Sequence, residues 1–325
     1  MQSKTKNKTM KRVVLLIIVV LMCCQMRAQQ TFTVLSYNIE NAFDTIHDAG
    51  KDDYEYCAGG ERKWNQYRLF QKLKGISKVI AAADEKRPVD LIGLCEVEND
   101  TVMQYLTQRT PLSKLGYRYI MTNSLDERGI DVALLYSPFT FHPVETEPIR
   151  PKMKKKDKTR DILHVAGTIT GGDTVDVYVI HLPSKRGGGE AQSLSMNICQ
   201  QLKAHLDSVQ VIRQRPNILV MGDFNAETNS PQLKFLTRSH HFIDRTAKLQ
   251  PGTYKYQGEW STIDHLLTHT TTLSHQRTRI LTLPFLLESD PTNGGEKPHR
   301  TYLGPVYQGG VSDHLPIMAV FHVKK

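Results

Sequence analysis

Residues 218–225 read Ile-Leu-Val-Met-Gly-Asp-Phe-Asn, a short apolar run that ends in an acid and an amide two positions apart. Such a run is typical of a buried strand. In an extended segment Asp223 and Asn225 point to the same face. One could accept a proton from water, while the other holds that water or a phosphate oxygen. Alone the pattern is weak evidence, because Asp and Asn are also common turn residues.

The rest of the chain alternates between strand and helix patterns, with a Gly171-Gly172-Asp173 hairpin turn. Amphipathic or apolar periodicity predicts helices over 64–80 and 191–206, and strands over 31–37, 91–95, 132–136, 175–181 and 218–221. Helix, strand and hairpin signals are mixed rather than strictly alternating. This mixture predicts an α/β sandwich, with sheets that carry helices on their outer faces, rather than a Rossmann fold.

Polar side chains fall just after or within the predicted strands. Because such residues converge where strand ends share an edge of a sheet, we expect one site there. The set comprises Asn38, Glu96, His181, Asp223 with Asn225, Asp264, and Asp313 with His314. The sequence has no G-x-S-x-G, G-x-x-x-x-G-K-[ST], H-E-x-x-H or G-x-G-x-x-G motif and no C-x-x-C. The oxygen-rich donors favour a hard cation such as Mg²⁺ over zinc.

Five short motifs occur in a characteristic order along the chain: Leu35-Ser36-Tyr37-Asn38, Cys95-Glu96-Val97, Ile180-His181-Leu182, Gly222-Asp223-Phe224-Asn225 and Ser312-Asp313-His314. Together with Asp264, this order resembles the endonuclease/exonuclease/phosphatase superfamily, and the chain looks like a secreted, bacterial-type member. The resemblance implies the fold of deoxyribonuclease I, a four-layered α/β sandwich in which two packed mixed sheets are flanked by helices. It also implies hydrolysis of a phosphate ester by in-line attack of water.

The same resemblance implies a role for each matched residue. Asp223 would take the proton of the attacking water, and His314, held by Asp264, would stabilise the charge that develops on phosphorus. The implied catalytic residues are His181, Asp223, Asn225, Asp264 and His314. The implied ligands of Mg²⁺, with Mn²⁺ or Ca²⁺ as alternatives, are Glu96, Asn38, Asp313 and Glu40. We expect Arg186, Lys185 and Arg128 to bind substrate, and the remaining histidines to be surface or core groups.

The substrate class stays open at this level. We favour a phosphodiesterase or endonuclease that acts on nucleic acid, with no obligate protein partner. The alternatives are a phosphomonoesterase, a sphingomyelinase-like lipid phosphodiesterase, and a catalytically silent binding module. The segment Gly258–Asp264 departs from the pattern of inositol phosphatases. We interpret the apolar segments 283–287 and 302–304 as cover for the core rather than a lipid-binding lip, and the lysine-rich run 152–160 as a solvated loop.

The amino-terminal segment has the features of a secretory signal peptide. It has basic residues up to Arg12, an apolar stretch over 13–22, and Met26-Arg27-Ala28 at the expected cleavage point. We therefore expect a signal peptide over 1–28 and a catalytic domain over 29–325, exported to the periplasm or beyond the cell. Cleavage would lower the formal net charge from +9 to +3. The net charge then gives no evidence for nucleic acid, and the three remaining cysteines, Cys57, Cys95 and Cys199, allow at most one internal disulfide.

Overall fold

The computed structural model describes residues 30–154, 158–184, 188–238 and 242–324. Contacts divide the chain into Met1–Thr31 and a compact unit, Phe32–Lys325, which holds the described elements apart from the first residue of the first strand. The expected signal peptide lies outside the described residues. Among the described helices, none has the length and apolar character needed to cross a membrane.

Two six-stranded sheets form the centre of the compact unit. The first has the spatial order β13 (Leu273–Ile280), β18 (Ile317–Val323), β1 (Thr31–Ala42), β2 (Leu91–Val97), β4 (Asp131–Tyr136) and β3 (Arg118–Met121). The second has the order β5 (Phe141–Ile149), β6 (Ile162–Ile169), β7 (Thr174–His181), β8 (Asn217–Asp223), β12 (Asp264–Thr270) and β9 (Ile243–Asp244). Each sheet is mixed, since β1–β2 and β7–β8 are parallel pairs with antiparallel neighbours.

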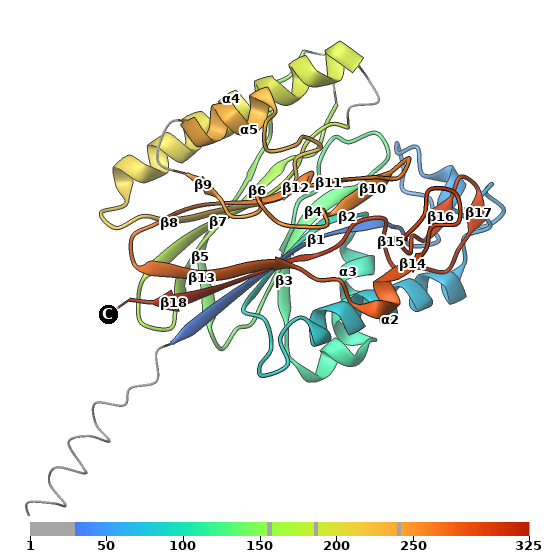
Figure 1. Cartoon of the computed structure of the whole chain (residues 1–325), viewed down its shortest axis with the longest axis horizontal. Coiled ribbons are helices and arrows are strands. Elements are labelled where there is room, and N and C mark those ends of the chain that lie inside the picture. Colours follow the sequence, from blue (N-terminus) through green and yellow to red (C-terminus); the bar gives the residue numbers. More distant parts are fainter. Residues whose placement is uncertain (1–29, 155–157, 185–187, 239–241, 325) are drawn as a thin grey trace, which may run out of the picture. The chain divides into compact units, whose positions relative to one another are not determined.

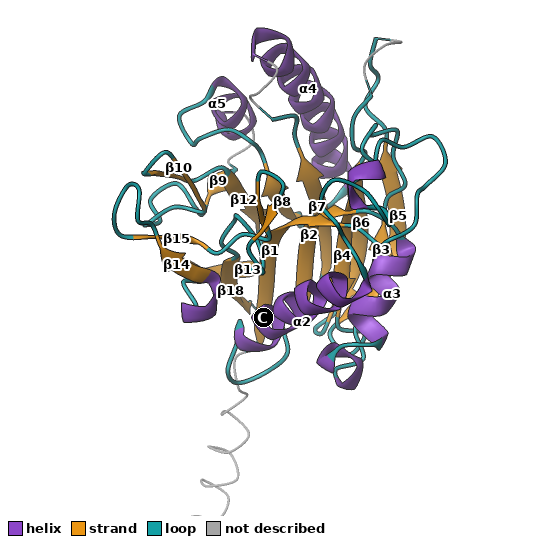
Figure 2. Ribbon diagram, turned by 90° about the vertical axis from the view of Figure 1, so that its right-hand side faces the viewer, coloured by secondary structure: helices purple, strands orange, loops and turns teal. Residues whose placement is uncertain are grey.

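Helices cover the outer faces of the two sheets. Figures 1 and 2 show α2 (Gln66–Ala82) and α3 (Asp100–Gln108) on one side, and α4 (Gly188–Ile212) and α5 (Pro231–Arg238) on the other. Short 3₁₀ turns and hairpins complete the unit: η1 (Tyr54–Tyr56), η2 (Pro111–Lys114), η4 (Pro284–Leu286), β10 (Tyr254–Tyr256) with β11 (Glu259–Ser261), β14 (Leu287–Ser289) with β15 (Glu296–Pro298), and β16 (Tyr302–Leu303) with β17 (Val306–Tyr307).

The central strands are apolar on both faces because both faces are buried. Along β2, Leu91 and Cys95 face the core between the sheets, whereas Ile92 and Leu94 face the core under α2 and α3. In β7 and β8 the alternate residues instead enter a third core beneath α4 and α5. The predicted four-layered sandwich is therefore confirmed, as are the predicted strands and helices. The strands and α4 extend beyond their predicted bounds, whereas α2 begins and ends two residues later than predicted.

The structure explains why a glycine, Gly222, precedes Asp223. Its φ of 137° lies in a region that side chains rarely adopt, and a Cβ there would lie 1.9 Å from the carbonyl oxygen of Ile180 on β7. The missing side chain lets the β7–β8 ladder continue to its last pair, His181 opposite Asp223. The position that precedes the acid is thus fixed by the close approach of two backbones.

One sequence expectation about the strand ends was wrong. Asp313 and His314 do not follow a strand but precede β18. They still reach the common edge because the start of β18 lies beside the end of β1, where the Ser312 hydroxyl donates to the carbonyl of Asn38 at 2.7 Å. Asp264 likewise opens β12, which runs antiparallel to β8 and places it opposite Asp223.

The apolar segments 283–287 and 302–304 lie largely against the core. Leu286 and Tyr302 are buried and their apolar neighbours pack against the core, as expected, but Leu303 is exposed. Lys152, Lys154 and Lys158 are exposed, as expected for a solvated loop, but Thr159 and Arg160 at the end of the run are buried. Cys57, Cys95 and Cys199 are free thiols, and burial raises the pKa of Cys95 well above its ordinary value.

Candidate active site

Asp223 is the centre of a polar cluster at one edge of the two sheets. Its Oδ2 accepts a hydrogen bond from Asn38 Nδ2 at 3.0 Å, and lies 3.6 Å from His181 Nε2 and 3.9 Å from His314 Nε2. Its Oδ1 accepts the backbone N–H of Asn225 at 2.7 Å. Two sheets and both imidazoles therefore meet at one buried carboxylate.

The pKa of Asp223 is raised above that of an ordinary carboxyl group. Burial is the main cause and the charge of Asp264 adds to it, whereas His314, the Asn225 N–H and Asn38 act in the opposite direction. A carboxylate whose pKa lies nearer to neutrality is a better proton acceptor, because the most effective general base has a pKa close to the working pH.

His314 is held as an imidazolium by carboxylates. Its Nδ1 donates to Asp264 Oδ2 at 2.7 Å, and its Nε2 lies 3.9 Å from Asp313 Oδ1. Burial opposes the charge on this ring, but Asp264, Asp223 and Asp313 together raise its pKa well above the ordinary histidine value. His314 therefore offers a positive charge beside Asp223, which is suited to the role that the family resemblance implies for it, stabilisation of the charge that develops on phosphorus.

Asn225 fixes the chain after Asp223. Its φ of 48° is left-handed, which asparagine tolerates better than most residues, and its Nδ2 donates to the carbonyl of Leu182 at 2.9 Å. The amide thereby ties the end of β8 to the end of β7.

Glu96 presents a partly accessible carboxylate, with 14% of its side chain exposed against 2% for Asp223. Oε1 accepts Asn38 Nδ2 at 3.3 Å and lies 3.9 Å from His181 Nε2, and Oε2 accepts the backbone N–H of Asn41 at 2.8 Å. The oxygens of Glu96, Asn38, Asp223 and Asp313 are the donors that hard divalent cations prefer. The residues present therefore fit a magnesium-type ion on the Glu96 side of the site.

Glu40 lies beside this group, but backbone donors occupy its carboxylate. Oε2 accepts the N–H of Thr301 at 2.6 Å, Oε1 accepts that of Tyr302 at 3.3 Å, and Arg300 Nε lies 3.8 Å from Oε1. Arg300 in turn donates to Asp313 Oδ2 at 2.6 Å. In the described structure Glu40 fixes the segment 300–302, which positions Asp313; its expected role as a metal ligand stays a prediction.

Arg160 is a residue of this site that sequence reasoning missed. Its Nε and Nη2 donate to the carbonyls of His181 and Leu182 at 3.2 and 2.8 Å, and its Nη1 pairs with Asp126 at 2.9 Å. Burial, followed by the charges of Arg160, Arg128 and His314, lowers the pKa of His181 well below its ordinary value. His181 is thus a neutral imidazole at physiological pH. Arg160 lies just before β6, a strand that neighbours β7, and this position in the sequence could have indicated that Arg160 lies near His181.

The expected substrate-binding cations are only partly described. Arg128 is exposed at the end of the loop before β4 and contributes positive charge near His181, whereas Lys185 and Arg186 lie outside the described residues. Beside Asn225 a cavity of about 490 Å³ opens between the amino-terminal ends of α4 and α5. Polar side chains form much of its lining: Gln192, Ser195, Asn225, Asn229, Ser230 and Gln232.

Comparisons with known proteins show the family and the fold of the chain. A sequence model of the Endonuclease/Exonuclease/phosphatase family matches residues 33–325. A family member from Bacteroides thetaiotaomicron superposes with a TM-score of 0.61 and 16% identity, over 90% of this chain and 98% of that chain. A mannosyl-6-phosphatase of the same organism gives 0.60 and 16%, over 89% and 99% of the two chains.

A further solved structure is D. rerio TDP2 in complex with single-strand DNA product. It superposes with a TM-score of 0.59 and 14% identity, over 90% of this chain and 100% of that chain. No curated protein matches the sequence. At these identities the solved structures show the fold alone, whereas the family match spans nearly the whole compact unit. The chain therefore belongs to the endonuclease/exonuclease/phosphatase family of phosphate-ester hydrolases.

Proposed function

We propose that this hydrolase is a magnesium-dependent phosphodiesterase that cleaves nucleic acid. The proposal rests on one observation: the buried carboxylate of Asp223 lies close to two imidazoles, neutral His181 and positively charged His314. Such a set can deprotonate water and also stabilise negative charge on a phosphate, which are the two requirements of phosphate-ester hydrolysis.

Asp223 accepts the proton of the attacking water, and Asn38, which donates to the same carboxylate, restricts the direction of that oxygen. His314 carries its charge at Nε2, on the side of Asp223, where it stabilises the negative charge of the transition state. Asp264 holds the ring in this orientation through Nδ1. His181, kept neutral, donates a hydrogen bond to the phosphate or to the leaving oxygen.

Family members generally use divalent metal ions, and we propose Mg²⁺ here, held by Glu96 with Asn38 and Asp313 in support. When bound, the ion would neutralise charge on the phosphate and on the leaving oxygen. The hydrogen bond from Asn41 N–H fixes one oxygen of Glu96 and thereby orients the carboxylate for this role.

Aromatic side chains beside the site support a substrate that carries a ring close to its phosphate. The Tyr254 ring lies 5.0 Å from that of His314, and Tyr256, two residues further along the same hairpin, is 59% exposed. Aromatic rings beside a phosphate site serve as stacking platforms for unpaired bases. Arg128, whose charge acts on His181, provides an exposed cation for the backbone of the substrate.

The test is a substrate panel of plasmid DNA, single-stranded DNA, RNA, mannose 6-phosphate and sphingomyelin vesicles, each with Mg²⁺ and with EDTA. The proposal predicts cleavage of nucleic acid that EDTA abolishes and that Asp223→Asn removes. Asp173→Asn is the matched control, because Asp173 lies at the opposite end of β7 from His181. Turnover of the other esters without any nuclease activity would contradict the proposed substrate.

A phosphomonoesterase that acts on a sugar phosphate is the second candidate. The polar cavity beside Asn225 is favourable to a hydroxyl-rich group of hexose size, and a mannosyl-6-phosphatase is among the structures with this fold. Hydrolysis of mannose 6-phosphate that depends on Asp223, with no cleavage of diesters, would establish this function instead.

We also propose that the protein is exported and acts outside the cytoplasm, on the evidence of the leader-like sequence over 1–28. Amino-terminal sequencing of the mature protein and its activity in the periplasmic or culture fraction test this proposal. An intact amino terminus with all activity in the cytoplasm would contradict it.

A further inference from the structure

Outside the active site, a row of polar side chains crosses the outer face of the second sheet. Glu147 on β5 pairs with His164 on β6, and His164 pairs with Tyr178 on β7. His205 from α4 packs over this row, with its ring 5.0 Å from that of His164 and 5.6 Å from that of Tyr178. Four elements thus bring a carboxylate and two imidazoles together beneath a helix.

The three potential ligand atoms have the spacing of a metal site. His205 Nε2 lies 3.0 Å and His164 Nδ1 lies 3.9 Å from the same oxygen, Glu147 Oε2, and all three atoms are within 4.8 Å of one another. Ligands about 2.1 Å from a tetrahedral zinc ion lie roughly 3.4 Å apart. The observed separations bracket this value, so small side-chain rotations would bring the atoms to ligand distance.

The other nitrogen of each imidazole is already bound to a group that orients it. His164 Nε2 donates to Asp176 Oδ1 at 3.0 Å, and Arg213 fixes Asp176 with two bonds of 2.9 Å. His205 Nδ1 contacts the Tyr178 hydroxyl at 2.9 Å. A hydrogen-bonded carboxylate or other polar group behind each histidine is the usual arrangement in metal centres, because it sets the tautomer and leaves the opposite nitrogen free to coordinate.

A second observation points directly to a ligand. His164 is 2% exposed, and its Nδ1 has no hydrogen-bond partner although it faces Glu147 and His205. A buried polar atom without a partner destabilises the fold, so native structures rarely retain one. The hydrogen bond from Nε2 to Asp176 leaves a lone pair on Nδ1, and a cation between the three side chains would satisfy it.

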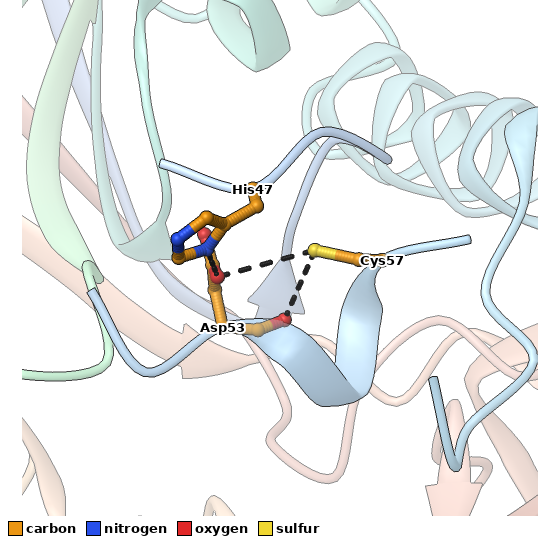
Figure 3. A group of neighbouring side chains, drawn as sticks. All are labelled: His47, Asp53 and Cys57. Atoms are coloured by element: carbon orange, nitrogen blue, oxygen red, sulfur yellow. Dashed lines mark hydrogen bonds and ion pairs between the residues drawn. The ribbon is translucent and has the colours of Figure 1, made fainter. Parts of the chain in front are cut away.

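Another group of ligand types, His47, Asp53 and Cys57, lacks this feature (Figure 3). His47 Nδ1 pairs with Asp53 Oδ1 at 2.5 Å, and the Cys57 thiol contacts the carbonyl of Asp53 at 3.6 Å and its Oδ1 at 3.9 Å. The Asp53 Oδ2 accepts the N–H of Asp48 at 2.7 Å. These side chains satisfy one another, and their arrangement requires no ion.

We propose that Glu147, His164 and His205 form a second metal site, which binds a divalent transition-metal ion of the Zn²⁺ type. Two imidazoles and one carboxylate suit such an ion better than Mg²⁺, which prefers oxygen. Three protein ligands leave one position for water, and the half-exposed Glu147 gives access from solvent. The ion joins α4 to β5 and β6 and so stabilises the packing of α4 on the second sheet.

The test uses the full-length protein, stripped with EDTA and dialysed, in a Glu96→Gln background that removes the proposed ligand of the active-site ion. Equilibrium dialysis with Zn²⁺ and the visible spectrum with Co²⁺ measure binding, and thermal unfolding measures stabilisation. We expect one Zn²⁺ per chain, a tetrahedral Co²⁺ spectrum and a rise in Tm. His205→Gln and Glu147→Gln should each weaken Zn²⁺ binding at least tenfold and abolish the rise in Tm.

His205 and Glu147 are partly exposed, so these variants should fold without metal, which circular dichroism checks. His142→Gln, an exposed histidine of β5, is the matched control and should bind Zn²⁺ as before. In the protein with Glu96 intact, His205→Gln should leave magnesium-dependent hydrolysis unchanged. Unaltered Zn²⁺ affinity in both ligand variants, or no Zn²⁺ binding by the parent protein, would overturn the proposal.

Discussion

The two parallel strand pairs, β1–β2 and β7–β8, both end at the active site, but they end differently. The β1–β2 ladder is regular only to the pair of Asn38 with Cys95, and beyond it Glu40, Asn41 and Glu96 all have positive φ values of 50°, 50° and 66°. The β7–β8 ladder stays in register to its last pair, His181 with Asp223. There a glycine, Gly222, takes the unusual backbone conformation instead.

This difference separates two tasks. The irregular end turns Glu96 outward, where 14% of its side chain is exposed and its oxygens can hold a cation. The regular end keeps Asp223 buried, with 2% exposed, beside His181. We infer that the irregular end of β1–β2 places Glu96 for ion binding. The regular end of β7–β8 holds the proposed proton acceptor, Asp223, in a buried and fixed position.

Asp223→Asn tests the regular end most severely. Loss of a positioned general base typically lowers rates by about 10²–10⁴-fold, and we expect kcat on a diester to fall within this range. Because the amide is nearly isosteric, the free energy of unfolding should change little. Steady-state kinetics and urea unfolding measure the two quantities, with Asp173→Asn as control. A variant that keeps full activity would show that Asp223 is not the base.

Gly222→Ala should disrupt the same end through the backbone. The new Cβ would lie 1.9 Å from the Ile180 carbonyl oxygen at a φ of 137°. Strain and overpacking should lower the free energy of unfolding by at least about 2 kcal/mol. Gly189→Ala on α4 is the matched control, since its Cβ would meet no atom within 4 Å. Urea unfolding measures the free energy of unfolding of both variants. Equal values would mean that β7 and β8 can move apart at Gly222 without loss of stability.

Asp264→Asn should shift the pH profile of kcat/KM. Asp264 raises the pKa of His314, which must stay protonated, and also that of Asp223, which must be ionised. Removal of its charge lowers both pKa values, so both limbs of the bell-shaped profile should move to lower pH. If kcat/KM falls while both apparent pKa values of the profile stay unchanged, Asp264 has a purely structural role.

A comparison of Glu96→Gly with Glu96→Ala measures the backbone strain at the irregular end of the β1–β2 pair. Both remove the proposed metal ligand, but only glycine adopts the φ of 66° without strain. We expect Glu96→Gly to be more stable than Glu96→Ala by about 1 kcal/mol, since a left-handed conformation costs a side chain roughly that amount. Equal free energies of unfolding would show that the local backbone relaxes and that the irregularity is not imposed by the sheet.

The sequence could predict the parts of this site that lie in continuous motifs. The apolar run before Gly222-Asp223-Phe224-Asn225 predicts β8, and the order of the motifs predicts the fold. Arg160 was missed because it ends a lysine-rich run, and its partner, Asp126, lies 34 positions away. The bonds of Glu40 span 261 and 262 positions, to Thr301 and Tyr302. Such pairs depend on how the sheets assemble, which local patterns do not encode.

The histidines away from the motifs show the same limit. Sequence reasoning treated His164 and His205 as surface or core groups, because periodicity places each only within its own strand or helix. Their shared contact with Glu147 requires the packing of α4 on the second sheet. The expected roles of Lys185 and Arg186 stay predictions, since both lie outside the described residues.

We infer that metal-dependent hydrolysis of a phosphate ester takes place at Asp223. Its most direct test is the rate of bis(p-nitrophenyl) phosphate hydrolysis by EDTA-stripped protein as Mg²⁺ is added back, for the wild type and for Asp223→Asn side by side. We expect no turnover without metal, full recovery of the wild type with Mg²⁺, and no recovery of the variant. Turnover by the stripped wild type, or recovery of Asp223→Asn to the wild-type rate, would contradict it.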